Sequence, residues 1–177
     1  MNDSHEDTKA RSSETDSRGG AETRRDLDEI TGTIIDCSVK LHQALGPGLL
    51  ESVYEAVLAR DLARRGFSVE RQKVLRFEYD GMSFEEGLRL DLLVESRVIV
   101  ELKSVETLHP VHKKQLLTYL RLAGQPVGLL INFGAATLKE GLHRIVNNFS
   151  PSASPRLRVN QEPHTKTQRH EEEGQNG

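Results

Sequence analysis

Cysteine is almost absent from this sequence, whose 177 residues contain only Cys37. A single cysteine cannot form a disulfide within the chain, which fits a reducing compartment. Long apolar runs are also missing, since none approaches the ~18 residues of a membrane span. The first residues are polar and charged, without the apolar stretch of a signal peptide. We therefore expect a cytoplasmic protein that has no membrane partner.

An excess of positive charge is missing as well. The formal net charge is -3, so the chain as a whole has no basic footprint for nucleic acid. Basic residues are nevertheless dense between residues 60 and 76, and Lys113 and Lys114 are adjacent. Either group is suited to contact phosphates, and either also fits a solvated helix face.

Apolar residues are scarce at both ends of the chain. Residues 1–26 are rich in Ser, Thr, Asp, Glu and Arg, and residues 151–177 in Pro, Ser, Gln, Glu and His. Segments of this composition bury too little apolar surface to offset the entropy lost on ordering. We expect disordered tails over 1–26 and 151–177, and one domain of ordinary size over 27–150.

The periodicity of apolar residues predicts both helices and strands within this domain. Helices are expected over 27–45, 49–65 and 110–123. Glycine follows each of them, and Pro110 suits the first position of the third. Strands are expected over 67–72, 74–79, 82–86, 88–94, 98–103, 127–133 and 142–146. Gly87 predicts a bulge or bend. The chain is thus predicted to be an α/β protein of the α+β type, in which helices flank a sheet of parallel and antiparallel strands.

The hairpin over residues 88–103 has the strongest pattern. If Val94 pairs with Val98, Asp91 lies directly opposite Glu101. Alternation along each strand then gives one apolar face, formed by Leu88, Leu90, Leu92, Val94, Val98, Val100 and Leu102. The other face carries Arg89, Asp91, Leu93, Ile99, Glu101 and Lys103. A shift of one residue would separate the two carboxylates.

Two opposed carboxylates in a sheet destabilise it unless something compensates their charge. They can share a proton, pair with a cation or bind a metal ion. Lys103 points to the same face, where it either neutralises the pair or holds a water or phosphate beside a metal. The residues alone leave these possibilities open.

Two helices supply further polar candidates. Glu51 and Tyr54 lie one turn apart, although a carboxylate in a first turn is also favoured by the helix dipole, and Tyr54 also fits a core or rim position. Gln115 and Tyr119 share a flank with His112, which is equally compatible with solvated or rim positions. Cys37 lies on an apolar helix face and is expected to be a buried small hydrophobe.

Two motifs carry a resemblance to known proteins. Asp91 followed by Glu101-Leu102-Lys103 resembles the D…ExK signature of the PD-(D/E)XK nuclease superfamily. The segment Gly48-Leu-Leu-Glu51-Ser-Val-Tyr54 resembles the defining motif of the GxxExxY protein family, a bacterial and archaeal branch of that superfamily. The resemblance extends over roughly residues 30–146. It implies a restriction-endonuclease-like αβββαβ core with an extra N-terminal helix.

The resemblance also implies roles for individual residues. Asp91 and Glu101 match the metal-binding acids, Lys103 the signature lysine and Glu51 the helical acid that joins the site in many members. Gln115 and Tyr119 resemble the Q-xxx-Y element of RecB-like nucleases. The backbone carbonyl of Leu102 is a further expected ligand. Leu90 stands where the signature has proline, a departure that puts little in doubt.

The implied function is that of a hydrolase, a Mg²⁺- or Mn²⁺-dependent nuclease that cleaves phosphodiester bonds of nucleic acid, DNA rather than RNA. The alternative is a catalytically weak or inactive nuclease-fold module that binds nucleic acid or a protein partner. In a third interpretation the carboxylates serve only as a structural ion network. The near-neutral charge of the domain favours the module, whereas the intact set of Glu51, Asp91, Glu101 and Lys103 favours the enzyme.

Overall fold

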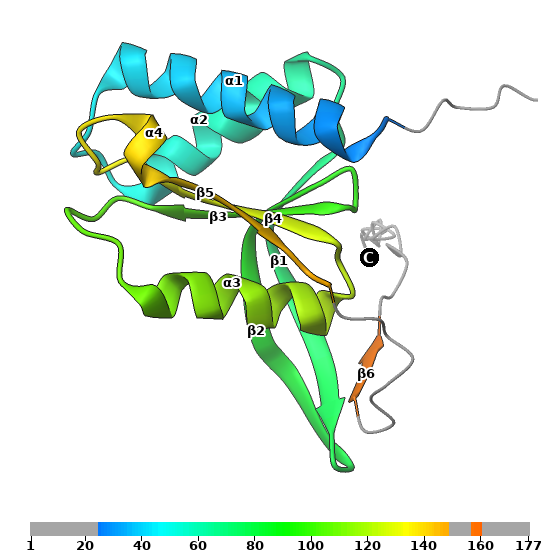
Figure 1. Ribbon diagram of the computed structural model, residues 1–177. Coiled ribbons are helices and arrows are strands. Elements are labelled where there is room, and N and C mark those ends of the chain that lie inside the picture. The colour runs from blue at the N-terminus through cyan, green and yellow to red at the C-terminus, as the bar shows by residue number, and fades with distance from the viewer. Residues whose placement is uncertain (1–24, 149–156, 161–177) are drawn as a thin grey trace, which may run out of the picture.

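The computed structural model describes residues 25–148 and 157–160 (Figure 1). Two helices come first, α1 (Leu27–Leu45) and α2 (Glu51–Arg64), and three strands follow them directly. These strands are β1 (Val69–Tyr79), β2 (Met82–Val94) and β3 (Val98–Lys103). The remaining elements are α3 (Pro110–Ala123), β4 (Val127–Asn132), α4 (Leu138–Gly141), β5 (Leu142–Val146) and β6 (Leu157–Asn160). The predicted αβββαβ order, with α1 as the extra helix, is confirmed.

The helix ends follow from local chemistry. The side chain of Asp26 accepts a hydrogen bond from the backbone N–H of Glu29 and so caps α1. Pro110 occupies the first turn of α3, where a missing N–H costs nothing. Gly124 ends the same helix with a left-handed φ of 63°, which glycine adopts without steric cost.

The strands form one mixed sheet in the order β5-β4-β3-β2-β1-β6. β3 and β4 are parallel, and every other neighbouring pair is antiparallel. Helices α1, α2 and α4 cover one face, and α3 covers the other (Figure 1). The central strands β3 and β4 are therefore buried on both faces, and Cys37 lies in the larger core as expected.

The β1–β2 hairpin extends well beyond the rest of the sheet as an arm (Figure 1). β2 pairs with β3 only from Leu92 to Val94, and no other described strand pairs with its first half on that side. Within the arm the register shifts between Leu75 and Phe77. Gly87 lies against the ring of Phe77, where an added Cβ would collide. The bulge or bend predicted at Gly87 is thus confirmed.

Two expectations differ from the structure. The predicted strands 67–72 and 74–79 are one continuous strand, β1, with Gln72 in its interior at a φ of 49°. Within the tail predicted to be disordered, Leu157–Asn160 forms β6 and pairs with residues 76–79 of β1. Arg25 and Asp26 are also described, and the other residues of both tails lie outside the described residues. No helix within residues 25–148 has the length and apolar character to cross a bilayer.

Candidate active site

The hairpin of β2 and β3 has the predicted register. Val94 pairs with Val98, Leu93 with Ile99 and Leu92 with Val100. The next residues along the two strands are Asp91 and Glu101. Here the backbone pairing of β2 with β3 ends, and the Asp91 side chain bonds to β3 instead. Its Oδ2 accepts a hydrogen bond of 2.8 Å from the backbone N–H of Leu102. Asp91 is therefore tied to β3 at the point where β2 diverges from it.

The sheet bends at the same point. Gln72 of β1, in a left-handed conformation, lies between the pairs Arg71–Leu92 and Lys73–Leu90. Leu90 and Leu88 belong to the core beneath α3, whereas Leu92 belongs to the core beneath α1 and α2. The prediction that all three share one face is wrong, because the bend interrupts the alternation of side chains.

Glu101 and Lys103 form an ion pair at the end of β3. Lys103 Nζ donates to Glu101 Oε1 over 2.7 Å. Glu101 is only 4% exposed, and its second oxygen, Oε2, is buried without a hydrogen-bond partner. Burial, and then the charge of Asp91, raise the pKa of Glu101 to about 7 against the opposing effect of Lys103. The carboxylate is therefore poorly compensated inside the protein.

The pKa values of Asp91 and Lys103 are shifted by burial and by the same neighbouring charges. Burial raises the pKa of Asp91, and the hydrogen bond from Leu102 only partly offsets this. Burial alone would lower the pKa of Lys103, but its hydrogen bond to Glu101 and the charges of Glu101, Asp91 and Glu51 raise it instead. Glu51 acts on all three groups. The four charged side chains predicted for the site are thus electrostatically coupled.

Glu51, the first residue of α2, reaches the end of β3. Its Oε1 accepts a hydrogen bond of 3.0 Å from the backbone N–H of Ser104. The Ser104 hydroxyl donates to the carbonyl of Leu49 over 2.7 Å, which ties the start of α2 to the same residue. A hollow of about 510 Å³ lies here, lined by residues 48–52 and Ser104. Glu51 itself is exposed at the edge of the site.

Tyr54 holds the loop that leads into α2. Its hydroxyl donates to the carbonyl of Gly46 over 2.6 Å and accepts from the backbone N–H of Leu49 over 3.2 Å. The ring is fully buried and stacks on Phe133 with centroids 4.3 Å apart. Tyr54 is thus a core aromatic that also anchors the loop before Glu51.

Gln115 and Tyr119 bind each other. Gln115 Nε2 donates to the Tyr119 hydroxyl over 2.6 Å on the flank of α3. In the described part of the chain neither side chain has a hydrogen bond to Asp91, Glu101 or Lys103. His112 accepts a hydrogen bond from the backbone N–H of His109 at the start of the same helix. The two side chains thus bond to each other, and their role in the site stays a prediction.

A comparison with models of protein families matches residues 28–145 to the PD-(D/E)XK nuclease superfamily. The chain belongs to this superfamily. The superfamily predicted from the D…ExK resemblance and the restriction-endonuclease-like fold are confirmed. The match does not extend to the GxxExxY family, which stays a prediction. No curated protein and no solved structure matches the chain.

The acids of this PD-(D/E)XK domain are arranged in a way that bears on metal binding. Across residues 25–148 and 157–160, no three His, Cys, Asp or Glu side chains are grouped so that they could hold an ion. The chemistry of the donors nevertheless fits a hard cation, because all are oxygens. Among the described residues, Lys103 pairs with Oε1 of Glu101, and the buried Oε2 has no hydrogen-bond partner. The buried Glu101 and half-buried Asp91 therefore fit a metal better than Glu51, which is exposed and accepts a hydrogen bond from Ser104.

Three residues around the PD-(D/E)XK site were missed from the sequence. Glu55, one turn after Glu51, is 5% exposed and accepts from Arg71 Nε at 2.8 Å and Gln72 Nε2 at 2.5 Å. Its charge helps to raise the pKa of Asp91. Besides Glu55, the residues missed are Gln72, which bonds to Glu55, and Ser104, which bonds to Glu51. The four-residue spacing from Glu51 was the only signal for Glu55. Gln72 and Ser104 bond to residues distant in sequence, and no local pattern reveals such contacts.

Proposed function

We propose that the protein is a metal-dependent nuclease that hydrolyses phosphodiester bonds of nucleic acid. One observation carries the proposal: Glu101 is buried beside Asp91 and Lys103 with one carboxylate oxygen unpartnered. A buried charged oxygen without a partner costs free energy, so its persistence favours a role for a bound cation. Membership of a nuclease superfamily supplies the reaction class, and analogy with that superfamily favours DNA over RNA.

Asp91 and Glu101 would hold the ion, with Glu51 and the backbone carbonyl of Leu102 as further oxygen ligands. Mg²⁺ or Mn²⁺ suits such a set, because both are hard cations that accept carboxylate and carbonyl oxygens. When bound, the ion would supply Lewis acidity toward a phosphate oxygen and lower the pKa of a water ligand. Oxygen ligands from three separate elements would then meet at the end of β3.

Lys103 is the chain's own contribution to the chemistry. Its raised pKa keeps the ammonium protonated at neutral pH. The ion pair with Glu101 holds it beside the two acids, where it can donate to an attacking water or to a phosphate oxygen as charge develops. Gln115 and Tyr119 are proposed to orient the phosphate or the acids from the rim. No residue needs to form a covalent intermediate in this hydrolysis.

A cleavage panel tests the proposal. Purified protein is incubated with Mg²⁺ or Mn²⁺ and with single-stranded, double-stranded and branched DNA and RNA. Lys103→Ala should abolish cleavage while circular dichroism shows an unchanged fold. Lys40→Ala is the matched control, since this exposed lysine of α1 pairs only with Asp36. Equal cleavage by the wild type and Lys103→Ala would show that a contaminant is responsible.

The lack of a three-ligand group among the described residues favours one second candidate, a nuclease-fold module that binds nucleic acid or protein with little chemistry. Calorimetric titration separates the two. The nuclease should bind Mg²⁺ or Mn²⁺, and Asp91→Asn and Glu101→Gln should each weaken that binding. A wild-type protein that binds neither ion at millimolar concentration would favour the module.

A further inference from the structure

Acidic residues are nearly absent from the later part of the folded chain, which therefore carries a net positive charge. Residues 109–148 contain five Lys or Arg residues and a single acidic residue, Glu140. Residues 25–108 have the opposite balance, with eleven Lys or Arg and sixteen Asp or Glu. The net charge of the folded chain is therefore the sum of two unlike parts. Residues 25–108, which include the arm, are acidic, and residues 109–148, which include α3, α4 and β5, are basic.

The basic residues between 60 and 76 are largely compensated by acids. Four of them form ion pairs with N···O distances of 3.0 Å or less. These pairs are Arg65 with Asp36 at 2.7 Å, Arg71 with Glu55 at 2.8 Å, Lys73 with Glu70 at 2.9 Å and Arg76 with Glu85 at 3.0 Å. Contact with a phosphate would compete with these pairs. This cluster is therefore poorly placed to hold a polyanion.

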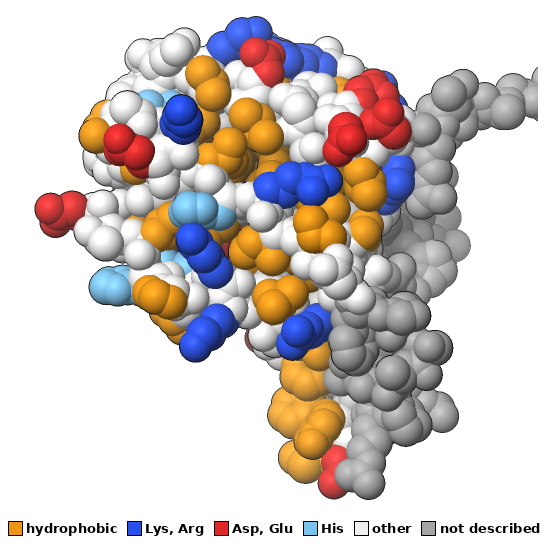
Figure 2. Space-filling model, viewed as in Figure 1, with side chains coloured by type: hydrophobic (Ala, Val, Ile, Leu, Met, Phe, Trp, Pro, Cys, Tyr) orange, Lys and Arg blue, Asp and Glu red, His pale blue; other side chains and the backbone are white. Residues whose placement is uncertain are grey.

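The lysines of the second half differ in this respect. Lys113 and Lys114, on the first turns of α3, and Lys139 of α4 are exposed. None of the three has an ion pair within the described part of the chain. In Figure 2, Lys and Arg side chains and histidines lie across the middle of the face formed by α3 and β5, while acidic side chains lie toward its edges. The charge on this face is available to a ligand.

His143 lies on the same side of the sheet as α3. It pairs with Leu130, whose side chain packs beneath α3, and opposed residues of antiparallel strands point to one face. Burial, and then the charge of Lys113, lower the pKa of His143, so these two groups are close. A neutral imidazole can still donate a hydrogen bond to a phosphate oxygen.

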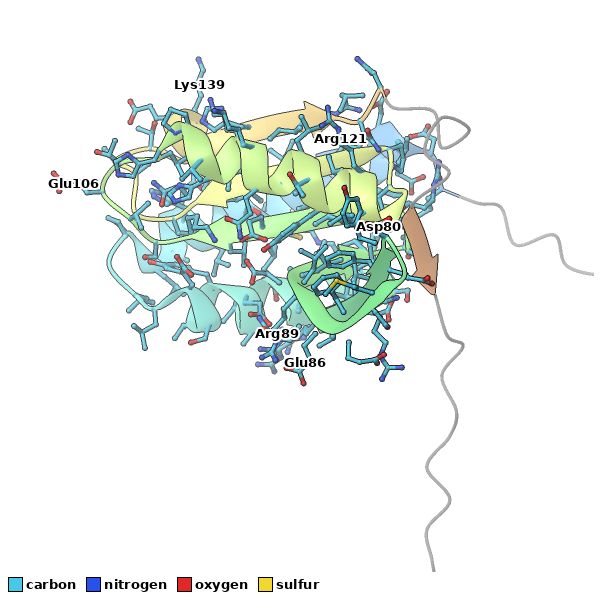
Figure 3. The ribbon with its side chains drawn as sticks, turned by 90° about the horizontal axis from the view of Figure 1, so that it is seen from below. Asp80, Glu86, Arg89, Glu106, Arg121 and Lys139 are labelled. Carbon is cyan, nitrogen blue, oxygen red and sulfur yellow. The ribbon has the colours of Figure 1, made fainter. Side chains whose placement is uncertain are left out.

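A hollow of about 580 Å³ lies between the loop before α3, the end of β4 and the segment that joins α4 to β5. Asn132 and His143 both line it, together with the loop 106–108. Asn132 is the parallel partner of Lys103 in the sheet, so a strand position that borders the hollow is adjacent to that of Lys103. Glu106 and Glu140 also line it. In Figure 3, Glu106 projects from one end of the molecule and Lys139 from the side above α3, opposite to Glu86 and Arg89 of the arm.

We propose that Lys113, Lys114, Lys139 and His143 form a basic surface that holds the phosphate backbone of a nucleic acid as it approaches Lys103. The identity of the polyanion rests on the proposed function. Contacts of this kind position the strand without reading its sequence. Because Glu106 and Glu140 repel phosphates, the backbone is expected to lie on the lysines at the rim of the hollow and not in its depth.

Binding measured without metal tests this surface independently of cleavage. Fluorescence anisotropy in EDTA is followed with a labelled DNA duplex, the corresponding single strand and an RNA of the same sequence. The double variant Lys113→Ala/Lys114→Ala should weaken binding of the tightest probe roughly tenfold, and for the duplex the slope of log K against log salt should fall by about 2. The matched control is Arg64→Ala/Arg65→Ala, two adjacent but ion-paired residues of α2, which should change affinity less than about twofold.

The outcomes separate this proposal from the proposed function. If the lysine variant binds like the wild type with the same salt slope, or if the wild type binds no probe, the basic surface is refuted. Cleavage by the wild type in the first case would leave the nuclease intact. If binding depends on the lysines but no metal supports cleavage, the surface is supported and the nuclease fails. Thermal unfolding of each variant excludes loss of fold as the cause.

Discussion

Replacing Glu101 by glutamine should change how the stability of the metal-free protein depends on pH. The Glu101 carboxyl is buried, its Oε2 has no partner and its pKa is about 7 instead of the ordinary 4.5. A raised pKa means that the folded protein holds this proton more tightly than the unfolded chain does. The stabilisation is fully present below pH 4.5 and is lost as the pH rises through 7.

The magnitude follows from the size of the shift. One pKa unit corresponds to about 1.4 kcal/mol, so Glu101 contributes about 3 kcal/mol between the two ends of this range. Most of that change falls between about pH 5 and pH 8, where chemical denaturation is convenient. Asp91, whose pKa is also raised, changes stability in the same direction. The wild type should therefore lose stability steadily as the pH increases.

Urea unfolding in EDTA across this pH range measures the effect. The free energy of unfolding of the wild type should fall by about 2–3 kcal/mol more than that of Glu101→Gln, which cannot lose the proton. Glu106→Gln, at an exposed position of the loop before α3, should follow the wild type. Millimolar Mg²⁺ should restore stability to the wild type at high pH by binding the folded state. Parallel curves for the wild type and Glu101→Gln in EDTA would refute the argument.

Two further substitutions test the structure around the site. Tyr54→Phe keeps the stack on Phe133 but removes the hydroxyl bonded to Gly46 and Leu49, so urea unfolding should show a loss of about 1 kcal/mol, with no loss for the exposed Tyr79→Phe. Gly128→Ala would bring a methyl group within 2.9 Å of Leu116 Cδ1 and should cost about 1–3 kcal/mol. The matched Gly32→Ala, on a helix with open space around it, should instead stabilise the protein by up to about 1 kcal/mol; equal melting temperatures for the two alanine variants would contradict this packing.

The parts of the fold that follow from periodicity were predictable. The β2–β3 register follows from matching the apolar residues of two short strands, and a slip of one residue would expose them all. Glu101 and Lys103 share a face for the same reason. Helix ends at Gly46 and Gly124 follow from the conformational freedom of glycine.

Features that depend on contacts distant in sequence were not predictable. The left-handed Gln72 bends the sheet and transfers Leu90 to the other core, although nothing in the alternation marks this residue. The short β6 forms only because β1 presents an edge to it. The two basic clusters look alike in sequence, and only their ion pairs distinguish compensated arginines from available lysines.

The candidate site is organised around the end of β3. Glu101 and Lys103 belong to this strand, Asp91 is bound to the backbone N–H of Leu102, and Glu51 to that of Ser104. A D…ExK pattern on an unrelated strand would place its Glu and Lys on one face equally well. This chain differs from such a coincidence in one respect. An acid of β2, Asp91, and an acid of α2, Glu51, each accept a hydrogen bond from the backbone of residues 101–104. The position of each acid relative to Lys103 is therefore set by backbone hydrogen bonds and not by flexible side-chain contacts alone, which is the preorganisation that electrostatic catalysis requires.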